Sequence, residues 1–473
     1  MAKSDLVTVK EAANLVGKAV HNIRYYLAYE RIGKFNQDGQ RITGRAKSGE
    51  LRVSLSELRT FIGLMNRGID KHHRAGLHAD LGFYDLAERE RTKHVHRLHP
   101  YLGKFIPQLV EWFLRRYFAE NDIILDPFLG SGTTLVQANE LGMNAVGVDV
   151  SEFNCRIARV KTEKYDIAAV KREVSLAEKE LTAFSRRLVD GEDAEDTFFP
   201  EQPIEELKKL LLSEVRSDYL KEWFAERTLY EMMYYKRLIR HSEHRDLLTV
   251  LLSRAVRSAR LIPHYDLARP KRPIEAGVEY WCRKHNRYCI PIEQLLVKIH
   301  AYSMDTIRRL ELFDRLRTDK HVEVIQGDSR AVNLTSALRR TPLKGRKIDG
   351  VFTSPPYVGQ IDYHDQHVYA YELFDIPRND DLEIGPKRSG VSKRAREDYI
   401  VGISDVLRRA RKFMKQDAKI FVVANDRLNL YPEIAKRSKL RIVDEFKRAV
   451  TKRTEQGDNP YHESIFHMEK ERR

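Results

Sequence analysis

The stretch that decides the fold is Asn121-Asp-Ile-Ile-Leu-Asp-Pro-Phe-Leu-Gly-Ser-Gly-Thr-Thr-Leu135. Residues 123–125 form a short apolar run, which is typical of a buried strand. Gly130 and Gly132 follow and permit a tight turn in which the backbone can approach a ligand closely. A helix is predicted over 135–141, directly after the turn. The turn has no lysine, which distinguishes it from a phosphate loop.

A second strand is predicted over 144–149, and it ends in the acid Asp149. Strand, glycine turn, helix, strand and terminal carboxylate, in this order, are the plan of half a Rossmann fold. A carboxylate at that strand end can accept hydrogen bonds from two ribose hydroxyl groups. The sequence therefore predicts an α/β domain with a nucleoside-containing ligand at the turn.

A second motif, Ile348-Asp-Gly-Val-Phe-Thr-Ser-Pro-Pro-Tyr357, is a predicted strand that runs into a Ser-Pro-Pro-Tyr turn. The two prolines lack amide donors, so their carbonyls and the hydroxyl of Ser354 can face a substrate. An exocyclic amine on a base requires such acceptors and a stacking platform, which Tyr357 offers. The alternative is an ordinary turn. Since both motifs occur in one chain, we predict a catalytic set of Ser354, Pro355, Pro356 and Tyr357.

Together the two motifs resemble those of the S-adenosylmethionine-dependent amino-methyltransferases of DNA. The segment before that family's glycine turn is similar to His99-Pro-Tyr-Leu-Gly-Lys-Phe-Ile-Pro107. The resemblance implies S-adenosyl-L-methionine as the cofactor and direct transfer of its methyl group to a base amine. It places His99, Tyr101, Lys104 and Phe105 around the methionine end of the cofactor, with Asp126, Phe128, Gly130, Gly132 and Thr133 along the methionine moiety. Asp149 would hold the ribose, and Asp328, at the end of a strand predicted over 321–328, would lie near the adenine amine.

The first residue of the catalytic motif bears on the target atom. In the related family, serine there commonly accompanies cytosine N4, whereas aspartate or asparagine accompanies adenine N6. Ser354 therefore favours cytosine N4. None of the three cysteines has the Pro-Cys context expected of a nucleophile for cytosine C5.

The rest of the chain predicts a mostly parallel sheet with a large insertion. Later strands are predicted over 419–424, 441–446 and 463–467, the last as an antiparallel insertion, with helices over 399–414 and 431–436 between them. Residues 165–320 are too long for a loop and have helical patterns over 170–189, 204–212, 220–241, 247–261 and 292–316. We interpret them as a helical insertion and a candidate target-recognition subdomain, in which 269–273 suits phosphate contact.

The N-terminal residues predict a small separate domain. Thr8-Val-Lys-Glu11 is a capping box for a helix that ends near Gly17, and a second helix is predicted over 18–31. Strand-like pieces at 32–35 and 51–53 and a third helix opened by Ser54 complete the segment. This order resembles the winged helix-turn-helix of the excisionase and MerR group, which implies DNA contact by Lys18, His21, Asn22, Arg24 and Tyr25. The alternative is a three-helix packing module without DNA contact.

The predicted organisation has five parts: a helix-turn-helix domain at 1–65, a linker at 66–97, the cofactor half of a methyltransferase domain at 98–164, the insertion at 165–320 and the catalytic half at 321–473. The net charge of +15 over 473 residues favours a polyanionic partner. Lys387, Arg388, Lys393 and Arg394, in a basic segment at 386–396 predicted to be a loop, are further candidates for DNA contact, with a solvated face as the alternative.

Composition also limits the setting. No apolar run is long enough to span a membrane, and the first residues lack the apolar core of a signal peptide. Three cysteines cannot form a disulfide framework, so a cytoplasmic protein is expected. Cys282-Arg-Lys-His-Asn-Arg-Tyr-Cys289, with His285 between the two cysteines, suggests a zinc site, but it lacks the usual Cys-x2–4-Cys spacing and an evident fourth ligand. We therefore favour a buried, unligated pair and predict no metal, with zinc binding as the alternative. We interpret His364 and His367 as loop histidines.

The favoured function is methylation of cytosine N4 in a base flipped out of double-stranded DNA, in restriction-modification or phage defence. Candidate partners are a cognate restriction nuclease or defence-system proteins, and we expect no association with a membrane. The alternatives are a DNA adenine-N6 methyltransferase, an RNA base-amine methyltransferase, and a DNA-binding regulator with an inactive methyltransferase fold.

Overall fold

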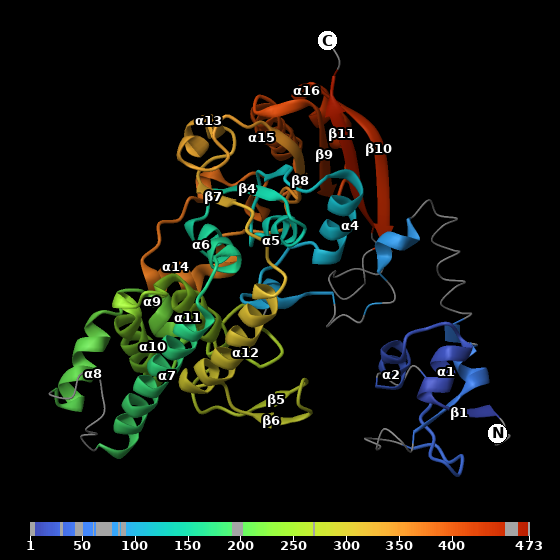
Figure 1. Cartoon of the computed structure of the whole chain (residues 1–473). Coiled ribbons are helices and arrows are strands. Elements are labelled where there is room, and N and C mark those ends of the chain that lie inside the picture. Colours follow the sequence, from blue (N-terminus) through green and yellow to red (C-terminus); the bar gives the residue numbers. More distant parts are fainter. Residues whose placement is uncertain are drawn as a thin grey trace. The chain divides into compact units, whose positions relative to one another are not determined.

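The computed structural model describes residues 5–28, 32–42, 51–59, 61–62, 78–83, 86, 91–191, 202–267, 270–449 and 462–471. The chain divides into two compact units (Figure 1). One unit comprises 1–91 with 445–465, and the other comprises 92–444 with 466–473. Each is described separately.

The N-terminal unit contains a two-stranded antiparallel sheet and short helices. Strands β1 (Leu6–Thr8) and β2 (Arg52–Ser54) pair, and α1 (Val9–Leu15) and α2 (Val20–Ala28) lie between them in sequence. The Thr8 side chain and that of Glu11 form the predicted capping box. Residues 55–59 and 61–62 are helical, and the short helix η2 (Ala79–Gly82) follows. The buried core of this unit includes Ala12, Ile23, Leu27, Val53 and Leu58.

Two predictions for this unit are wrong. The strand predicted at 32–35 is absent: Phe35 makes only isolated bridges, to Arg41 and Arg52. Instead β1 is the partner of β2, and its three residues are too few to produce an alternating pattern. The second helix begins at Val20, so Lys18 lies in the turn before it.

The larger unit is built on a seven-stranded sheet in the order β10-β11-β9-β8-β3-β4-β7, of which residues 445–449 of β10 and 462–465 of β11 count with the other unit. Its strands are β3 (Ile123–Asp126), β4 (Asn144–Asp149), β7 (Val322–Gln326), β8 (Ile348–Thr353), β9 (Met414–Ala424), β10 (Leu440–Ala449) and β11 (His462–Lys470). Pairs β3–β4, β3–β8, β4–β7 and β8–β9 are parallel. The last strand lies between β10 and β9, in the inserted position that the sequence predicts. A mostly parallel sheet with intervening helices confirms the α/β fold class.

Alternate residues of the central strands face opposite layers of helices. Val351 of β8 belongs to the apolar cluster of α13 (Leu334–Ala337), α15 (Lys393–Arg411) and α16 (Tyr431–Ser438). Its neighbour Phe352 points to the other face, where its ring centroid is 5.6 Å from that of Phe113 in α4 (Pro107–Tyr117). Helices α5 (Thr133–Glu140) and α6 (Glu152–Thr162) follow β3 and β4 in the chain. Both faces of the sheet are therefore covered, as a parallel sheet requires.

The basic segment at 386–396 is not the predicted loop throughout. Ser392 caps α15 by accepting a hydrogen bond from the Ala395 amide, so Lys393 and Arg394 lie in the first helical turn. At the other end, α15 ends at Arg411 and Met414 already begins β9. Serine at an N-cap is the sequence signal for this start.

The residues between the second and third strands of the sheet form a helical insertion. It contains α7 (Ile167–Asp190), α8 (Ile204–Ser213), α9 (Asp218–Trp223), α10 (Glu226–Leu238), α11 (Arg245–Ser258) and α12 (Leu296–Asp314). The single helix predicted over 220–241 is two helices, because the backbone at Phe224 and Ala225 is extended. The hairpin of β5 (Tyr280–Cys282) and β6 (Arg287–Cys289) lies before α12 and was not predicted.

A buried carboxylate organises this insertion. Glu231 of α10 accepts hydrogen bonds from the Leu295 and Leu296 amides, at 2.6 and 3.0 Å, at the start of α12. Its other oxygen accepts from the Ser185 hydroxyl of α7 at 2.6 Å. Glu231 thus satisfies amides that a helix start leaves without partners and joins three helices.

The remaining elements are short. They are α14 (Val368–Phe374) and the 3-10 helices η4 (His94–Arg97), η5 (Ile239–His241), η6 (Leu338–Arg340), η7 (Asp365–His367), η8 (Asp380–Leu382) and η9 (Lys387–Ser389). Across the described residues, no helix combines the length and the apolar character needed to cross a membrane.

Candidate active site

The two sequence motifs meet at one cavity, at the carboxyl ends of β3, β4 and β8. Its empty volume of about 870 Å³ includes space that is open to solvent. In open α/β sheets, ligands bind at this edge. Predicted residues that line the cavity are Tyr101, Lys104, Phe105, Asp126, Phe128, Gly130, Thr133, Asp149, Asp328, Ser354 and Pro356.

Asp149 at the end of β4 ties the glycine turn to the next helix. Its Oδ2 accepts a hydrogen bond from the Gly130 amide at 2.8 Å. Its Oδ1 accepts from the Ser151 amide at 2.9 Å and from Asn154 Nδ2 at 3.2 Å. A carboxylate has about four lone-pair sites, so acceptor capacity remains for a ligand hydroxyl. Burial raises the pKa of Asp149, and the three donors oppose that rise.

Asp126 at the end of β3 joins the cofactor motif to the catalytic motif. Its Oδ1 accepts a hydrogen bond from the Thr353 hydroxyl of β8 at 2.6 Å and from the Phe128 amide at 3.1 Å. Burial raises the pKa of Asp126 to about 6, although these hydrogen bonds lower it. The carboxyl group therefore fixes the relative positions of the two strand ends and lines the cavity.

The two glycines of the turn serve different purposes. Gly130 has φ +49°, and a Cβ there would lie 3.2 Å from the hydroxyl oxygen of Tyr101, so this glycine permits the ring to cover the turn. Gly132 has φ +79°, and a Cβ there would lie 2.9 Å from the Cβ of Ala158. Gly132 does not line the cavity and instead allows α5 to pack against α6.

His99 also lies apart from the cavity. Its side chain is buried, and its ring nitrogens contact the Pro100 carbonyl at 2.9 Å and the Ser253 hydroxyl of α11 at 3.1 Å. Burial holds the pKa of His99 well below its usual range. Both ring nitrogens already have protein partners, and the cofactor contact of His99 stays a prediction.

Lys104 and Asp328 line the cavity with partners of their own. The Lys104 ammonium donates to the His96 carbonyl at 2.8 Å, and burial lowers the pKa of Lys104 to about 8. Asp328 accepts hydrogen bonds from Arg330 Nε to both its oxygens at 2.9 Å. Phe105 is buried, with its ring edge-on to that of Phe352.

The Ser-Pro-Pro-Tyr turn leaves β8 at the same edge. Ser354 and Pro356 line the cavity, whereas Pro355 and Tyr357 do not. The Pro356 carbonyl accepts a hydrogen bond from the Tyr399 hydroxyl of α15 at 2.9 Å. That carbonyl is therefore partly occupied by the protein, and the Ser354 hydroxyl is the side-chain acceptor of the motif that reaches the cavity.

Sequence reasoning missed several lining residues: Ser131, Ser151, Asn154, Ser329, Tyr363, His364 and Glu383. His364, interpreted as a loop histidine, is buried, and its Nδ1 lies 2.5 Å from Glu383 Oε1. Ser329 donates to the Pro127 carbonyl at 2.6 Å. The polar and aromatic residues directly after the catalytic motif were a usable signal for Tyr363 and His364, but no local pattern marks Glu383.

The residues predicted to contact DNA are placed as follows. Arg24 is exposed on α2, while the side chains of His21, Asn22 and Tyr25 lie outside the described residues, as does Arg269. Lys387, Arg388, Lys393 and Arg394 are exposed. Arg388 contacts Glu383 at 3.2 Å and the Asp380 carbonyl at 2.5 Å, so it also supports a lining residue of the cavity.

Comparison with known proteins identifies the family. A family model described as DNA methylase (N6_N4_Mtase) matches residues 10–160. The Type II methyltransferase M.MjaII of Methanocaldococcus jannaschii is 41% identical over 98% of this chain and 97% of that protein. The chain belongs to the Type II DNA amino-methyltransferases.

Other matches are partial. The Type II methyltransferase M.MvaI of Kocuria varians is 28% identical over 30% of this chain and 34% of that protein. Among solved structures, TrmN from Thermus thermophilus matches 78% of this chain and 50% of that chain, with 12% identity and a TM-score of 0.28. A score this low supports no conclusion about this methyltransferase.

The cofactor of the methyltransferase is S-adenosylmethionine. The cavity suits this cofactor because a strand-end carboxylate, Asp149, can accept from a ribose diol, and the Gly130 turn admits close approach of the backbone. When bound, S-adenosylmethionine supplies a methyl group on a sulfonium. Anionic Asp126 and Asp149 in the same cavity complement its positive charge.

Proposed function

We propose that this methyltransferase transfers the methyl group to N4 of a cytosine that is flipped out of double-stranded DNA. The observation that carries the proposal is the placement of Ser354 in the cavity that also contains Asp126 and Asp149. A base inside the duplex cannot bring its amine to such a cavity, so the base must be extruded.

The catalytic motif positions the amine. The Ser354 hydroxyl accepts one N4 hydrogen, which directs the nitrogen lone pair toward the methyl carbon. The carbonyl of Pro355, which does not line the cavity in this structure, would have to turn toward the base to accept the second hydrogen. Bound S-adenosylmethionine would supply the methyl group, its sulfur would keep the electron pair of the broken C–S bond, and the amine would release one proton to solvent. No covalent enzyme intermediate is needed, so the protein contributes orientation and a water-poor pocket.

The proposed cofactor site follows from the lining residues. Asp149 accepts from the ribose, and Asp126, Phe128, Gly130 and Thr133 contact the methionine moiety. Tyr101, Lys104 and Phe105 close the methionine end, and Asp328 lies at the adenine. Tyr363, His364 and Glu383 extend the cavity and are proposed contacts for the extruded base.

The basic residues and the N-terminal unit supply DNA binding in this proposal. Arg24 of α2 with Lys387, Lys393 and Arg394 are exposed cations suited to phosphates. The relatives are named Type II methyltransferases, which supports a role in restriction-modification beside a cognate nuclease or other defence proteins. The role in restriction-modification is tested by asking whether DNA from a host that expresses this chain resists the nuclease that cuts the same site.

Nucleoside mass spectrometry of product DNA tests the target atom. The expected product is N4-methylcytosine. N6-methyladenine without N4-methylcytosine would overturn the cytosine assignment, and methyl transfer to RNA alone would overturn the DNA substrate. An absence of transfer to any nucleic acid, with S-adenosylmethionine bound, would favour a regulator with an inactive fold.

Two variants separate the roles within the motif. Ser354→Ala removes an acceptor that orients the amine and should lower the methylation rate more than DNA affinity. Tyr357→Ala should lower both, because stacking of a base on an aromatic ring is worth about 1–3 kcal/mol. Equal effects of Ser354→Ala on rate and affinity would contradict the orienting role.

A further inference from the structure

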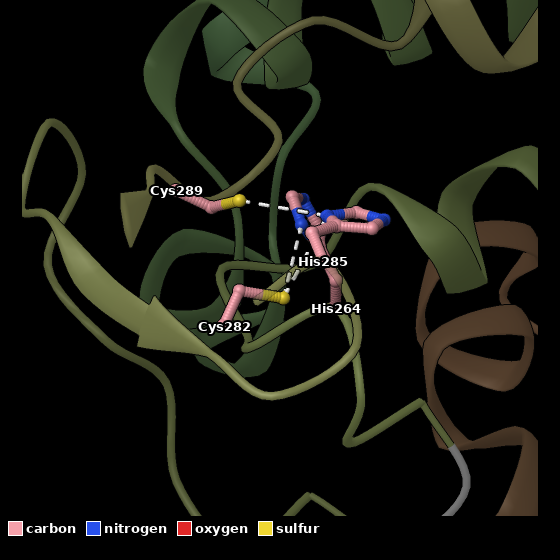
Figure 2. Close-up of side chains that lie close together, drawn as sticks. All are labelled: His264, Cys282, His285 and Cys289. Atoms are coloured by element: carbon pink, nitrogen blue, oxygen red, sulfur yellow. Dashed lines mark hydrogen bonds between the residues drawn. The ribbon is translucent and has the colours of Figure 1, made fainter. Parts of the chain in front are cut away.

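Four side chains in the helical insertion converge on one point (Figure 2), and none of the four lines the cavity. They are His264, Cys282, His285 and Cys289. One ligand atom of each, a ring nitrogen or a sulfur, lies within 4.8 Å of the ligand atoms of the other three. The sequence predicts an unligated cysteine pair because no fourth ligand is evident beside it. The fold supplies one, since His264 comes from the segment after α11, 18 residues before Cys282.

The distances match those of a tetrahedral centre. Cys289 Sγ lies 3.5 Å and Cys282 Sγ 3.6 Å from His285 Nδ1, and Cys282 Sγ lies 4.0 Å from His264 Nδ1. Zinc bonds of about 2.3 Å to sulfur and about 2.0–2.1 Å to nitrogen, at tetrahedral angles, place sulfur and nitrogen about 3.6 Å apart. These three distances thus lie within about 0.4 Å of the sulfur–nitrogen spacing that the ion would impose.

Thiol–imidazole hydrogen bonds do not account for this arrangement. One imidazole nitrogen has either one hydrogen or one lone pair, so it can satisfy one thiol. Here two sulfurs approach the same Nδ1 of His285 at nearly equal distances. An ion at the centre contacts all four ligand atoms at once.

The local backbone is that of a metal-binding turn. Cys282 ends β5 and Cys289 ends β6, and the turn between them places His285 three residues after Cys282. Both the His285 and the Asn286 amides donate to the Cys282 carbonyl, at 3.2 and 2.8 Å. Asn286 has φ +52°, which closes this tight turn. With histidine as the second ligand, the spacing becomes Cys-x2-His, equivalent to the short Cys-x2–4-Cys pairs that the sequence analysis sought.

The hairpin has few other means of stabilisation. Its strands have three residues each, and Cys282 is its buried residue. Trp281 and Tyr288 contact each other but remain 50% and 65% exposed. A two-stranded hairpin without an apolar core is marginal in water, whereas a structural metal contributes folding free energy directly.

We propose that His264, Cys282, His285 and Cys289 bind one structural Zn²⁺ that fastens the β5–β6 hairpin to the segment after α11. Two sulfurs and two imidazoles in a tetrahedron select zinc among common biological cations, and four protein ligands leave no open position for catalysis. This site is independent of the proposed methylation chemistry.

Metal content of the full chain tests the proposal. Protein produced with zinc in the medium and purified under reducing conditions should contain one zinc per chain by plasma mass spectrometry. Cys289→Ser and His264→Asn should each lose most of that zinc. The matched controls Cys155→Ala and His300→Asn change a cysteine and a histidine outside the cluster and should retain it.

Cobalt provides a readout on the unmodified chain, in case a variant fails to fold. Reduced metal-free protein titrated with Co²⁺ should develop the intense visible absorption of a tetrahedral thiolate site at one equivalent, and Zn²⁺ should abolish it. Zinc should also protect two of the three thiols from alkylation. Octahedral cobalt spectra or zinc retained by Cys289→Ser would each overturn the site.

Discussion

Replacing Asp149 with asparagine should weaken S-adenosylmethionine binding by about 10- to 150-fold. The carboxylate accepts from the Gly130 and Ser151 amides at 2.8 and 2.9 Å and, in the proposed function, from the ribose. A hydrogen bond to a charged group is worth about 1.5–3 kcal/mol. Since about 1.4 kcal/mol is a factor of ten, losing the charge-assisted bond to the ribose yields that range.

The same substitution also disturbs the turn. The new amide group presents an N–H₂ to at least one donor that Asp149 now satisfies. A buried donor without a partner costs about 1–3 kcal/mol, so the free energy of unfolding should fall as well. Affinity must therefore be measured on protein shown by circular dichroism to be folded.

Asp349→Asn is the matched control. Asp349 lies in β8 of the same sheet, accepts from the Ile123 amide at 2.8 Å and pairs with Lys415, but it does not line the cavity. The control should lower stability while leaving the Kd for S-adenosylmethionine unchanged in isothermal titration calorimetry. Equal affinities of wild type and Asp149→Asn, or equal losses in both variants, would refute the assignment of Asp149 to the cofactor.

Three further predictions concern packing, pH and DNA binding. Gly350→Ala would place a Cβ 1.9 Å from the Phe118 ring and should lower the free energy of unfolding, measured by urea titration, by at least about 1–3 kcal/mol. Gly327→Ala is the control, because a Cβ there would meet open space. Equal stabilities of the two variants would contradict the close packing at Gly350. Because burial raises the folded-state pKa of Asp126 from 3.8 to about 6, the folded protein binds its proton more tightly than the unfolded chain. The resulting stabilisation is complete below about pH 3.8 and is lost as pH rises through about 6. The difference in melting temperature between wild type and Asp126→Asn should therefore change across this pH range. A constant difference would contradict the raised pKa. Lys387→Glu and Lys393→Glu, made singly, should each reduce both DNA affinity and the slope of log K against log salt, measured by fluorescence anisotropy, whereas Lys179→Glu on α7 serves as a charge-matched control. An unchanged slope would remove these lysines from the interface.

The sequence by itself determined the α/β class and most of the cavity. The motifs around Gly130 and Ser354 are local: strand, turn and helix follow from residues adjacent in the chain, and a parallel sheet brings the strand ends to one edge. Asp126, Asp149 and Ser354 could therefore be located before the fold was known. The capping box at Thr8 and Glu11 is predictable for the same reason.

Tertiary structure alone decided what depends on residues distant in sequence. His99 resembles a cofactor residue by its motif, but its ring is occupied by Ser253 of α11, 154 residues later. Glu383 lies at the cavity, hydrogen-bonded to His364, and His264 joins the cluster around Cys282 although the two are far apart in sequence. No periodic pattern of the sequence relates residues at these separations. Helix and strand patterns report which face of an element is buried, because burial follows the period of the backbone. They carry no information about which distant segment covers that face, and that choice is made by the packing of the whole unit.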